Sequence, residues 1–242
     1  MDLTCVIPAF ENPGLLTRCL TSVVAQEDVN LEIVVTDDSR TAAVRDLVGA
    51  FPAVRYLQGA LTGNPVDNWN RGLDQAGGDL RVVVHHDEYL VDPRYLRRAT
   101  DAMADPSVAA VTGGVVVAGA SRFALAAGVA RSLGSPPWLL PAINWIGPTA
   151  AFVFRRGHRF DPGLVQLVDV EFYRRVLAAG RLASLGGVCV GSLGRHPAQI
   201  TARIDSRHVA LAELRGLAHR ARPPISPLAY AVLRSWWEVR SW

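Results

Sequence analysis

Side chains that can bind a cation or move a proton are concentrated where one strongly apolar segment ends. In "RVVVHHDEYL", residues 81–90, three valines run directly into His85, His86, Asp87 and Glu88. Carboxylate oxygens suit hard divalent cations, and magnesium is usually shared with the phosphates of a substrate. A neutral imidazole can also ligate a transition metal. The cluster is therefore either a solvated turn or the edge of an active site.

Two earlier apolar segments also end in polar residues. Residues 3–8 lead into Phe10 and Glu11, and residues 31–38 close with two aspartates. Ligands of open α/β sheets bind beyond the carboxyl ends of the parallel strands. We therefore expect the three polar ends to meet at one edge of a sheet.

The elements that position these residues alternate between strand and helix patterns in the first half of the chain. The predicted strands cover residues 3–8, 31–38, 53–59 and 79–88. The predicted helices cover residues 13–26, 41–51, 64–78 and 92–105. Continuous apolar strands separated by helices are typical of a mainly parallel, Rossmann-like sheet with helices on both faces, so we predict a single α/β domain.

The second half is less regular. We predict a strand pair with a glycine turn over residues 107–119, and a loop over the site at residues 118–147. Further strands are expected at residues 149–156 and 182–191, and further helices at residues 169–180 and 206–221.

Composition excludes several classes of protein. Half of the 242 residues are hydrophobic and 19% are charged, which is typical of a folded globular chain. The net charge of +3 is too small to indicate nucleic-acid binding. The three cysteines form no CxxC pair, so we expect neither a zinc site nor a disulfide framework, which suits a reducing cytoplasm.

Neither end of the chain predicts a membrane span. The first residues have no basic region followed by a long apolar run, so no signal peptide is expected. The tail "PLAYAVLRSWWEVRSW", residues 227–242, mixes tryptophans with arginines. It is either a helix packed on the domain or a segment lying in a membrane interface, which leaves peripheral membrane contact open.

Three common nucleotide and nucleophile motifs are missing. No GxGxxG follows the first strand, and the chain has neither GxxxxGK[ST] nor GxSxG. What remains is a carboxylate-rich site at the strand ends, whose chemistry suits a divalent cation holding a diphosphate.

Five segments in order then resemble the family-2 glycosyltransferases, which are inverting enzymes with the GT-A fold that use nucleotide-diphosphate sugars. They are "VIPAFENPGLLTRCLTSVVAQ", "EIVVTDDSR", "GNPVDNWNRGL", "VVVHHDEYLVDP" and "VDVEFYRRVLAAG", and a sixth, "RHPAQIT", is compatible with the family. The resemblance runs from about residue 3 to about residue 201. It implies a GT-A domain over residues 1–205, with a nucleotide-binding half (1–115) and an acceptor half (116–205), followed by a helical extension (206–242).

The resemblance assigns the donor-binding residues. Those that line the nucleotide pocket or the diphosphate path are Pro8, Ala9, Phe10, Glu11, Asp38, Asn68, Asn70 and Arg71. Asp38 matches the aspartate that accepts a hydrogen bond from the base. Glu11 departs from the family pattern, which has asparagine there. Trp69 and Asn70 stand where the family commonly has Arg-Asn, so a phosphate contact of the family is either lost or moved to Arg71.

The family's Asp-x-Asp motif falls on the histidine cluster. Aligning on Tyr89 places His85 at the ribose-binding acid, His86 in the middle and Asp87 at the metal position. The resemblance implies a divalent cation, Mn²⁺ or Mg²⁺, with Glu88 and His196 as further metal ligands.

The resemblance also implies the catalytic base. Asp169 matches the family aspartate that deprotonates the acceptor hydroxyl, while Val168 stands where the family has glutamate. Each assignment keeps a structural alternative. Phe10 and Trp69 could be core residues, Asp38 a helix cap, Arg71 a solvated side chain, residues 85–88 a polar strand end without metal, His196 a structural histidine, and Asp169 an acid stabilised by a helix dipole.

The expected function is therefore transfer of a hexose or pentose from a nucleotide-diphosphate sugar to an acceptor hydroxyl. The acceptor is expected to be a small molecule, a lipid-linked compound or a glycan. One alternative is a nucleotidyltransferase, but that class needs a glycine- and lysine-rich loop after the first strand, and this chain contains no lysine. The other is a non-catalytic sugar-nucleotide-binding module, which His85 and Val168 favour.

Overall fold

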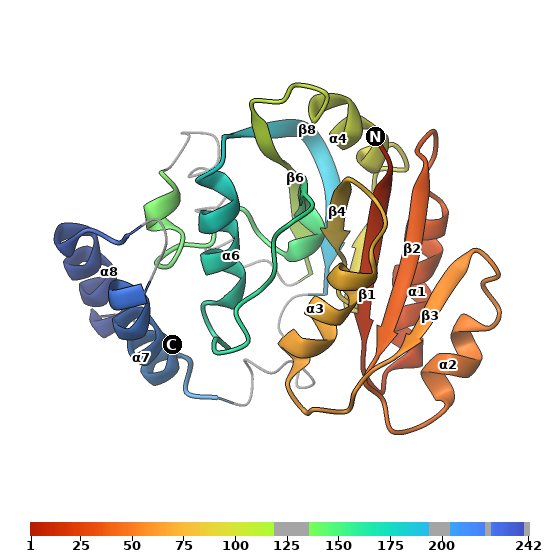
Figure 1. The fold of residues 1–242 in the computed structure, drawn as a ribbon, viewed down its shortest axis with the longest axis horizontal. Helices are drawn as coiled ribbons and strands as arrows, with labels where there is room; N and C mark the ends of the chain where they lie inside the picture. The colour runs from red at the N-terminus through yellow and green to blue at the C-terminus, as the bar shows by residue number, and fades with distance from the viewer. Residues whose placement is uncertain (119–135, 194–203, 221–223, 240–242) are drawn as a thin grey trace.

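The computed structural model describes residues 1–118, 136–193, 204–220 and 224–239. Within them, one eight-stranded sheet is flanked by helices (Figure 1). The strands are β1 (Leu3–Ala9), β2 (Leu31–Asp37), β3 (Val54–Gln58), β4 (Leu80–Val83), β5 (Glu88–Leu90), β6 (Val108–Val117), β7 (Phe152–Arg155) and β8 (Arg181–Ser192).

Seven α-helices and two short 3₁₀ helices are described. The α-helices are α1 (Pro13–Val24), α2 (Ala43–Val48), α3 (Pro65–Gln75), α4 (Tyr95–Ala102), α6 (Val168–Leu177), α7 (Ser206–Arg220) and α8 (Pro227–Val239). The 3₁₀ helices are η1 (Pro137–Leu139) and η2 (Thr149–Ala151).

The sheet is parallel where the strand and helix patterns alternate and mixed beyond it. Its order is β3-β2-β1-β4-β7-β6-β8-β5. The first four strands in this order are all parallel, as is the β6–β8 pair, whereas β7 runs antiparallel to both neighbours and β5 antiparallel to β8. The predicted α/β class and single domain are confirmed, and the added antiparallel pairs make the sheet mixed.

Helices cover both faces of the sheet because successive side chains of each strand point to opposite sides. Val6 packs in a core that includes side chains of α3, α6, α7 and α8. Its neighbours Cys5 and Ile7 pack in a second core with α1, α2 and α4. This burial on both faces explains why the strands read as continuous apolar runs.

Helix α3 lies unusually close to the sheet. Asn64 caps it, with its side-chain oxygen accepting from the N–H of Val66 at 3.0 Å. A Cβ at Gly72 would overlap the side chain of Val6 and approach that of Thr36. The close packing brings the polar first turns of α3 to the ends of β1 and β2.

The sequence predicts one strand over residues 79–88, and this prediction is wrong. Strand β4 ends at Val83, and the Val84 N–H makes a last bond to the Val6 carbonyl at 2.9 Å. The chain then turns, with the N–H of Glu88 donating to the His85 carbonyl at 2.9 Å. Glu88 begins the antiparallel strand β5, so the polar cluster occupies a turn between two strands.

The predicted strand pair over residues 107–119 is also wrong. Residues 108–117 form the single strand β6, whose register against β8 shifts around Gly113 and Gly114. The two glycines permit close backbone approach, since a Cβ at Gly114 would overlap the Gly187 carbonyl oxygen. Of the loop predicted at 118–147, residues 119–135 lie outside the described part of the chain.

Helices α7 and α8 lie together beyond α6, at the side of the molecule opposite α2 (Figure 1). The indole N–H of Trp237 donates to the Pro141 carbonyl at 2.8 Å, and Leu233 and Trp237 are buried in the core that contains α6. The expected packing of the C-terminal segment on the domain is thus seen for α8. No helix among the described residues is long and apolar enough to cross a membrane.

Candidate active site

The ends of β1 and β2 are joined by polar contacts of Glu11. Its carboxylate accepts from the Arg40 N–H at 2.7 Å and from the Thr41 hydroxyl at 2.8 Å, and its own N–H donates to the Ser39 hydroxyl at 2.7 Å. Glu11 has a left-handed backbone, with φ of 46°. These bonds lower the pKa of Glu11 and fix the loop after β1 against the loop after β2.

The residues before Glu11 divide between core and surface. Pro8 and Ala9 are buried in β1, and the Ala9 carbonyl accepts from the Asp38 N–H at 3.1 Å. Phe10 is 55% exposed, so it is not a core residue. Its ring is therefore accessible at the strand end where the sequence placed the nucleotide pocket.

The two aspartates that close β2 have different environments. Asp37 is fully buried and accepts from the Ser39 N–H and the Tyr56 hydroxyl, both at 2.8 Å. Asp38 is only partly buried, and one of its oxygens accepts from the Leu61 N–H at 2.7 Å. Asp37 therefore stabilises the turn, while Asp38 faces a pocket.

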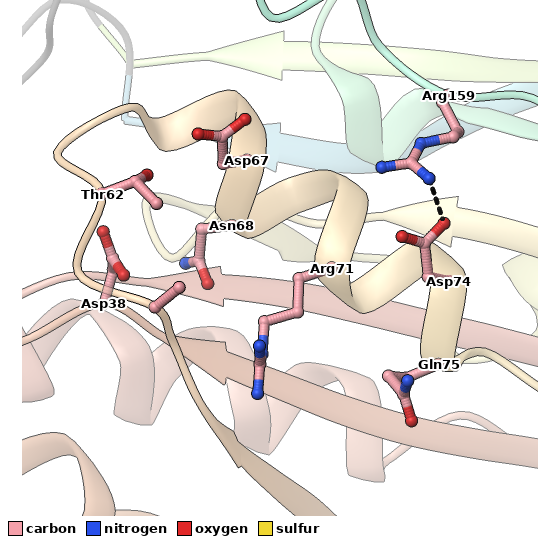
Figure 2. Close-up of a pocket in the computed structure, with 9 residues that line it drawn as sticks. Asp38, Thr62, Asp67, Asn68, Arg71, Asp74, Gln75 and Arg159 are labelled. Carbon is pink, nitrogen blue, oxygen red and sulfur yellow. Dashed lines mark ion pairs between the residues drawn. The ribbon is translucent and has the colours of Figure 1, made fainter.

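That pocket has a volume of about 310 Å³ and lies between the end of β2 and the outer side of α3 (Figure 2). It is lined by Asp38, Ala60, Thr62, Asp67, Asn68, Arg71, Asp74, Gln75 and Arg159. Arg71 is exposed, and Arg159 forms an ion pair with Asp74 at 3.0 Å. Two guanidinium groups and several acceptors give the pocket groups that can bind an anionic, hydrogen-bonding ligand.

Asn68 and Asn70 are both buried, but in different places. The Asn68 amide donates to the Thr36 carbonyl at 2.9 Å, and its buried side-chain oxygen has no hydrogen-bond partner within the described part of the chain. Asn70 forms a pair of bonds with the backbone of Phe160, both at 2.9 Å. Asn68 thus lines the pocket, whereas Asn70 fixes the loop that carries Arg159.

His85 lies against Trp69, with ring centroids 4.5 Å apart. Burial lowers the pKa of His85 to about 4, although the charge of Asp87 acts in the opposite direction. The imidazole is therefore neutral at pH 7 and can donate or accept one hydrogen bond. His86 adds a smaller effect that also lowers the pKa of His85.

Glu88 holds the turn in place from inside the protein. Its side chain is buried, and one oxygen accepts from the His85 N–H at 3.0 Å, the Ala150 N–H at 3.1 Å and the Thr149 hydroxyl at 3.3 Å. Burial and the neighbouring charge of Asp87 raise its pKa well above the usual range. This carboxylate connects the turn to η2.

Asp169 lies in the first turn of α6, and the charge of Asp87 reaches it. One oxygen of Asp169 is buried without a hydrogen-bond partner among the described residues. Burial, and then the charge of Asp87, raise the pKa of Asp169 to about 6. Because Asp87 also raises the pKa of Glu88, the fold brings three carboxylates into one electrostatic cluster.

The described residues contain no complete metal centre. No group of three or more His, Cys, Asp or Glu side chains among them is arranged to hold a metal ion. His196 lies outside the described residues. Asp87 nevertheless fits a hard cation, because its carboxylate offers oxygen ligands. Its negative charge also raises the pKa of the two neighbouring acids, Glu88 and Asp169, so positive charge at this place would be favourable.

The sequence analysis missed six of the nine residues that line the pocket, among them Asp74 and Arg159. Asp74 follows Arg71 by three residues on α3, a spacing that places both on one face, so it could have been found. Arg159 could not, because only the long-range bonds between Asn70 and Phe160 bring its loop to α3.

With this geometry in view, comparisons with known proteins identify the class. The sequence matches glycosyl transferase family 2 across residues 4–153. A Mycobacterium tuberculosis protein, "Uncharacterized protein MT1568", is 28% identical over 98% of this chain and 81% of its own length. A "GalNAc(5)-diNAcBac-PP-undecaprenol beta-1,3-glucosyltransferase" of Campylobacter jejuni is 30% identical over 37% of this chain and 30% of its own length.

Solved structures agree on the fold. S. aureus TarS 1-349 in complex with UDP-GlcNAc superposes with a TM-score of 0.72 and 16% identity, covering 98% of this chain and 72% of that chain. Mannosyltransferase PcManGT from Pyrobaculum calidifontis, in complex with GDP-Man and Mn²⁺, gives 0.71 and 18%, covering 98% and 73%. The chain belongs to glycosyltransferase family 2, has the GT-A fold and is a glycosyltransferase, which confirms the predicted family and enzyme class.

The different environments of Asp37 and Asp38 predict different losses of stability when each is changed to alanine. Asp37→Ala removes two buried acceptors, so we expect the free energy of unfolding to fall by about 1–3 kcal/mol. Asp38→Ala removes a bond that water can replace, and the loss should stay below about 1 kcal/mol. Urea denaturation with an unchanged m-value measures both, and equal losses would contradict the assignment.

Proposed function

We propose that the protein is an inverting glycosyltransferase that uses a nucleotide-diphosphate sugar and a divalent cation. The observation that carries the proposal is the electrostatic cluster formed by Asp87 and Glu88, which follow β4, and Asp169, in the first turn of α6. One acid of this cluster fits a cation, and another has a pKa of about 6, close to the value that suits a general base.

The pocket of Figure 2 supports a nucleotide donor. Asp38 would accept a hydrogen bond from an N–H of the base, and Phe10, exposed just after β1, would offer its ring to the base. Arg71 and Arg159 supply positive charge for the diphosphate. The neighbours TarS and PcManGT bind UDP-GlcNAc and GDP-Man, so uridine and guanosine donors are the first candidates.

Asp87 would hold Mn²⁺ or Mg²⁺, with Glu88 and His196 as the further ligands that we propose. When bound, the cation neutralises charge on the departing diphosphate. Glu88 would act chiefly through the turn, since one of its oxygens already accepts three internal hydrogen bonds. His85 would donate to the ribose or contact the metal as a neutral imidazole.

Asp169 would act as the base. It takes the proton of the acceptor hydroxyl while the hydroxyl oxygen forms a bond to the anomeric carbon. The bond from that carbon to the diphosphate oxygen breaks, and the electron pair leaves with the nucleoside diphosphate. Attack from the face opposite the leaving group inverts the anomeric centre.

Two features favour a second candidate, a non-catalytic sugar-nucleotide-binding module. His85 and Val168 replace acids of the family pattern. Incubation with a panel of UDP- and GDP-sugars and Mn²⁺ separates the two candidates. Release of nucleoside diphosphate from one donor supports the enzyme, whereas tight binding of a donor without release supports the module.

The base assignment predicts a selective loss. Asp169→Asn should lower turnover by at least about 10²-fold, because an amide cannot take the proton, while the affinity for the nucleoside diphosphate should stay within about twofold. Donor turnover and isothermal titration measure the two effects. Asp101→Asn, which changes an exposed acid of α4, is the control. Near-normal turnover in Asp169→Asn would remove this residue from the mechanism.

The metal assignment predicts a linkage between cation and nucleotide. A nucleoside diphosphate and Mn²⁺ together should raise the melting temperature of the wild type more than the sum of their separate effects. Asp87→Asn should lose that excess, because it removes the proposed ligand, and Asp101→Asn should keep it. An excess that survives in Asp87→Asn would place the cation elsewhere.

The acceptor and the location of the enzyme are also proposals. We propose a small-molecule, lipid-linked or glycan acceptor met in the cytoplasm. Peripheral membrane contact would use α8, where Leu228, Val232 and Val239 are 76%, 43% and 80% exposed at spacings that share one side of the helix. The curated Campylobacter relative is named for an undecaprenol-linked substrate, which supports an acceptor of this kind.

This contact predicts binding to lipid vesicles. The wild type should sediment with phosphatidylglycerol vesicles, and changing the three α8 residues to serine should release it. Val24→Ser removes an apolar residue of α1 that is about as exposed as Val232, and it should have no effect. A wild type that stays in the supernatant would exclude the proposed contact.

A further inference from the structure

A carboxylate of the C-terminal helix pair contacts the start of the helix that carries Asp169. Glu213 of α7 accepts from the N–H of Val165 at 2.6 Å and from the N–H of Leu167 at 2.8 Å. The N–H of Gln166 lies between the two carboxylate oxygens, 3.2 Å from each. One side chain thus binds three successive backbone donors.

These three donors lie immediately before the first residue of α6. Leu167 is the N-cap of the helix, and its own side chain cannot accept a hydrogen bond. The Leu167 carbonyl accepts the first helical bond, from the N–H of Glu171 at 2.9 Å. Glu213 therefore binds the N–H of the N-cap residue itself from another helix, as the glutamate of a capping box does within one helix.

The charge of Glu213 also suits this place. The amino end of a helix carries partial positive charge, so a carboxylate there stabilises the first turn. Charge-assisted bonds to backbone N–H groups are about twice as strong as neutral ones. The bonds thereby fix the chain two residues before Asp169.

Helix α7 is itself fixed on this side of the domain. Ala210, Leu214 and Leu217 are buried in the core that also contains Val168 and Phe172. The flanking residues therefore restrict how far Glu213 can move relative to α6. The family match covers residues 4–153, so both α6 and α7 lie beyond it.

We propose that Glu213 is a positioning residue for the reaction: it sets the start of α6 and thereby the place of the Asp169 carboxylate. This inference rests on the proposed role of Asp169 as base. It makes the α7–α8 extension part of the active-site framework. A displacement of about 1 Å at a reacting group can cost about 10²-fold in rate, so the bonds matter to turnover even if the fold survives without them.

The test compares Glu213→Ala with Glu213→Gln. We expect Glu213→Ala to lower kcat by about 10- to 100-fold, with KM for the donor changed by less than about twofold, because the nucleotide pocket is built from other elements. Glu213→Gln keeps one acceptor oxygen and should recover part of kcat. Glu238→Ala removes a carboxylate of α8 that pairs with Arg234, and should behave as the wild type.

Hydrogen exchange of the amides of residues 165–167 reports the clamp without any turnover. Exchange should accelerate in Glu213→Ala and less so in Glu213→Gln, with the amides of β1 unchanged. Unchanged kcat in Glu213→Ala, or an equal rise in exchange throughout the domain, would overturn the proposal.

The two proposals fail in different ways. If the wild type transfers sugar, Asp169→Asn is inactive and Glu213→Ala keeps full kcat, only the role of Glu213 is lost. If Asp169→Asn keeps near-normal turnover, the proposed base falls and the role of Glu213 falls with it, while the exchange result still shows whether the three bonds exist.

Discussion

The buried carboxylate of Glu88 is the contact on which the arrangement of the site depends. Through one oxygen it binds the His85 N–H of the turn and both Thr149 and Ala150 of η2. It stands at the first residue of β5, where the chain reverses after β4. Without an acceptor there, the donors of the turn would be buried and unpaired, which costs more than the bonds themselves contribute. The turn that presents Asp87 is therefore fixed to η2 by one buried side chain.

The chemistry follows from crowding negative charge beside this turn. Asp87 raises the pKa of both Glu88 and Asp169, so the cluster favours proton uptake. The same crowding would favour binding of a divalent cation, because its positive charge would stabilise the carboxylates in their ionised form. The start of α6 adds its partial positive charge to Asp169, and Glu213 fixes the backbone just before it. The pocket between the end of β2 and α3 contributes the guanidinium groups of Arg71 and Arg159.

Much of this was accessible from the sequence, because the strands of the first half are buried on both faces and end in polar residues. The pattern predicted β1, β2 and β3 closely, and α1 begins after Asn12, whose side-chain oxygen accepts from the Leu15 N–H at 3.1 Å. Residues 85–88 were evident from their chemistry, and the family resemblance gave them roles and added Asp169.

Other features depend on contacts that no local pattern records. In the sequence, Glu88 looks like one more acid of a metal-binding motif. Its structural role follows only from its bond to the Ala150 N–H of η2, which is distant in the sequence. Asp37 and Asp38 are adjacent and identical, yet the hydroxyl of Tyr56 distinguishes them. The glycines of β6 were interpreted as a turn. Glycine is also the residue that permits a close approach between two backbones, which is its role in β6. Glu213 binds residues nearly fifty positions away, as its bond to Val165 shows.

The most direct test of the account is the position of the cation and nucleotide. Crystals grown with Mn²⁺ and the nucleoside diphosphate that binds best would give anomalous density at the manganese edge. We predict one strong peak at the Asp87 carboxylate, with the base in the pocket beside Asp38 and the diphosphate between them. A peak elsewhere, or a nucleotide bound away from the ends of β1 and β2, would contradict the account.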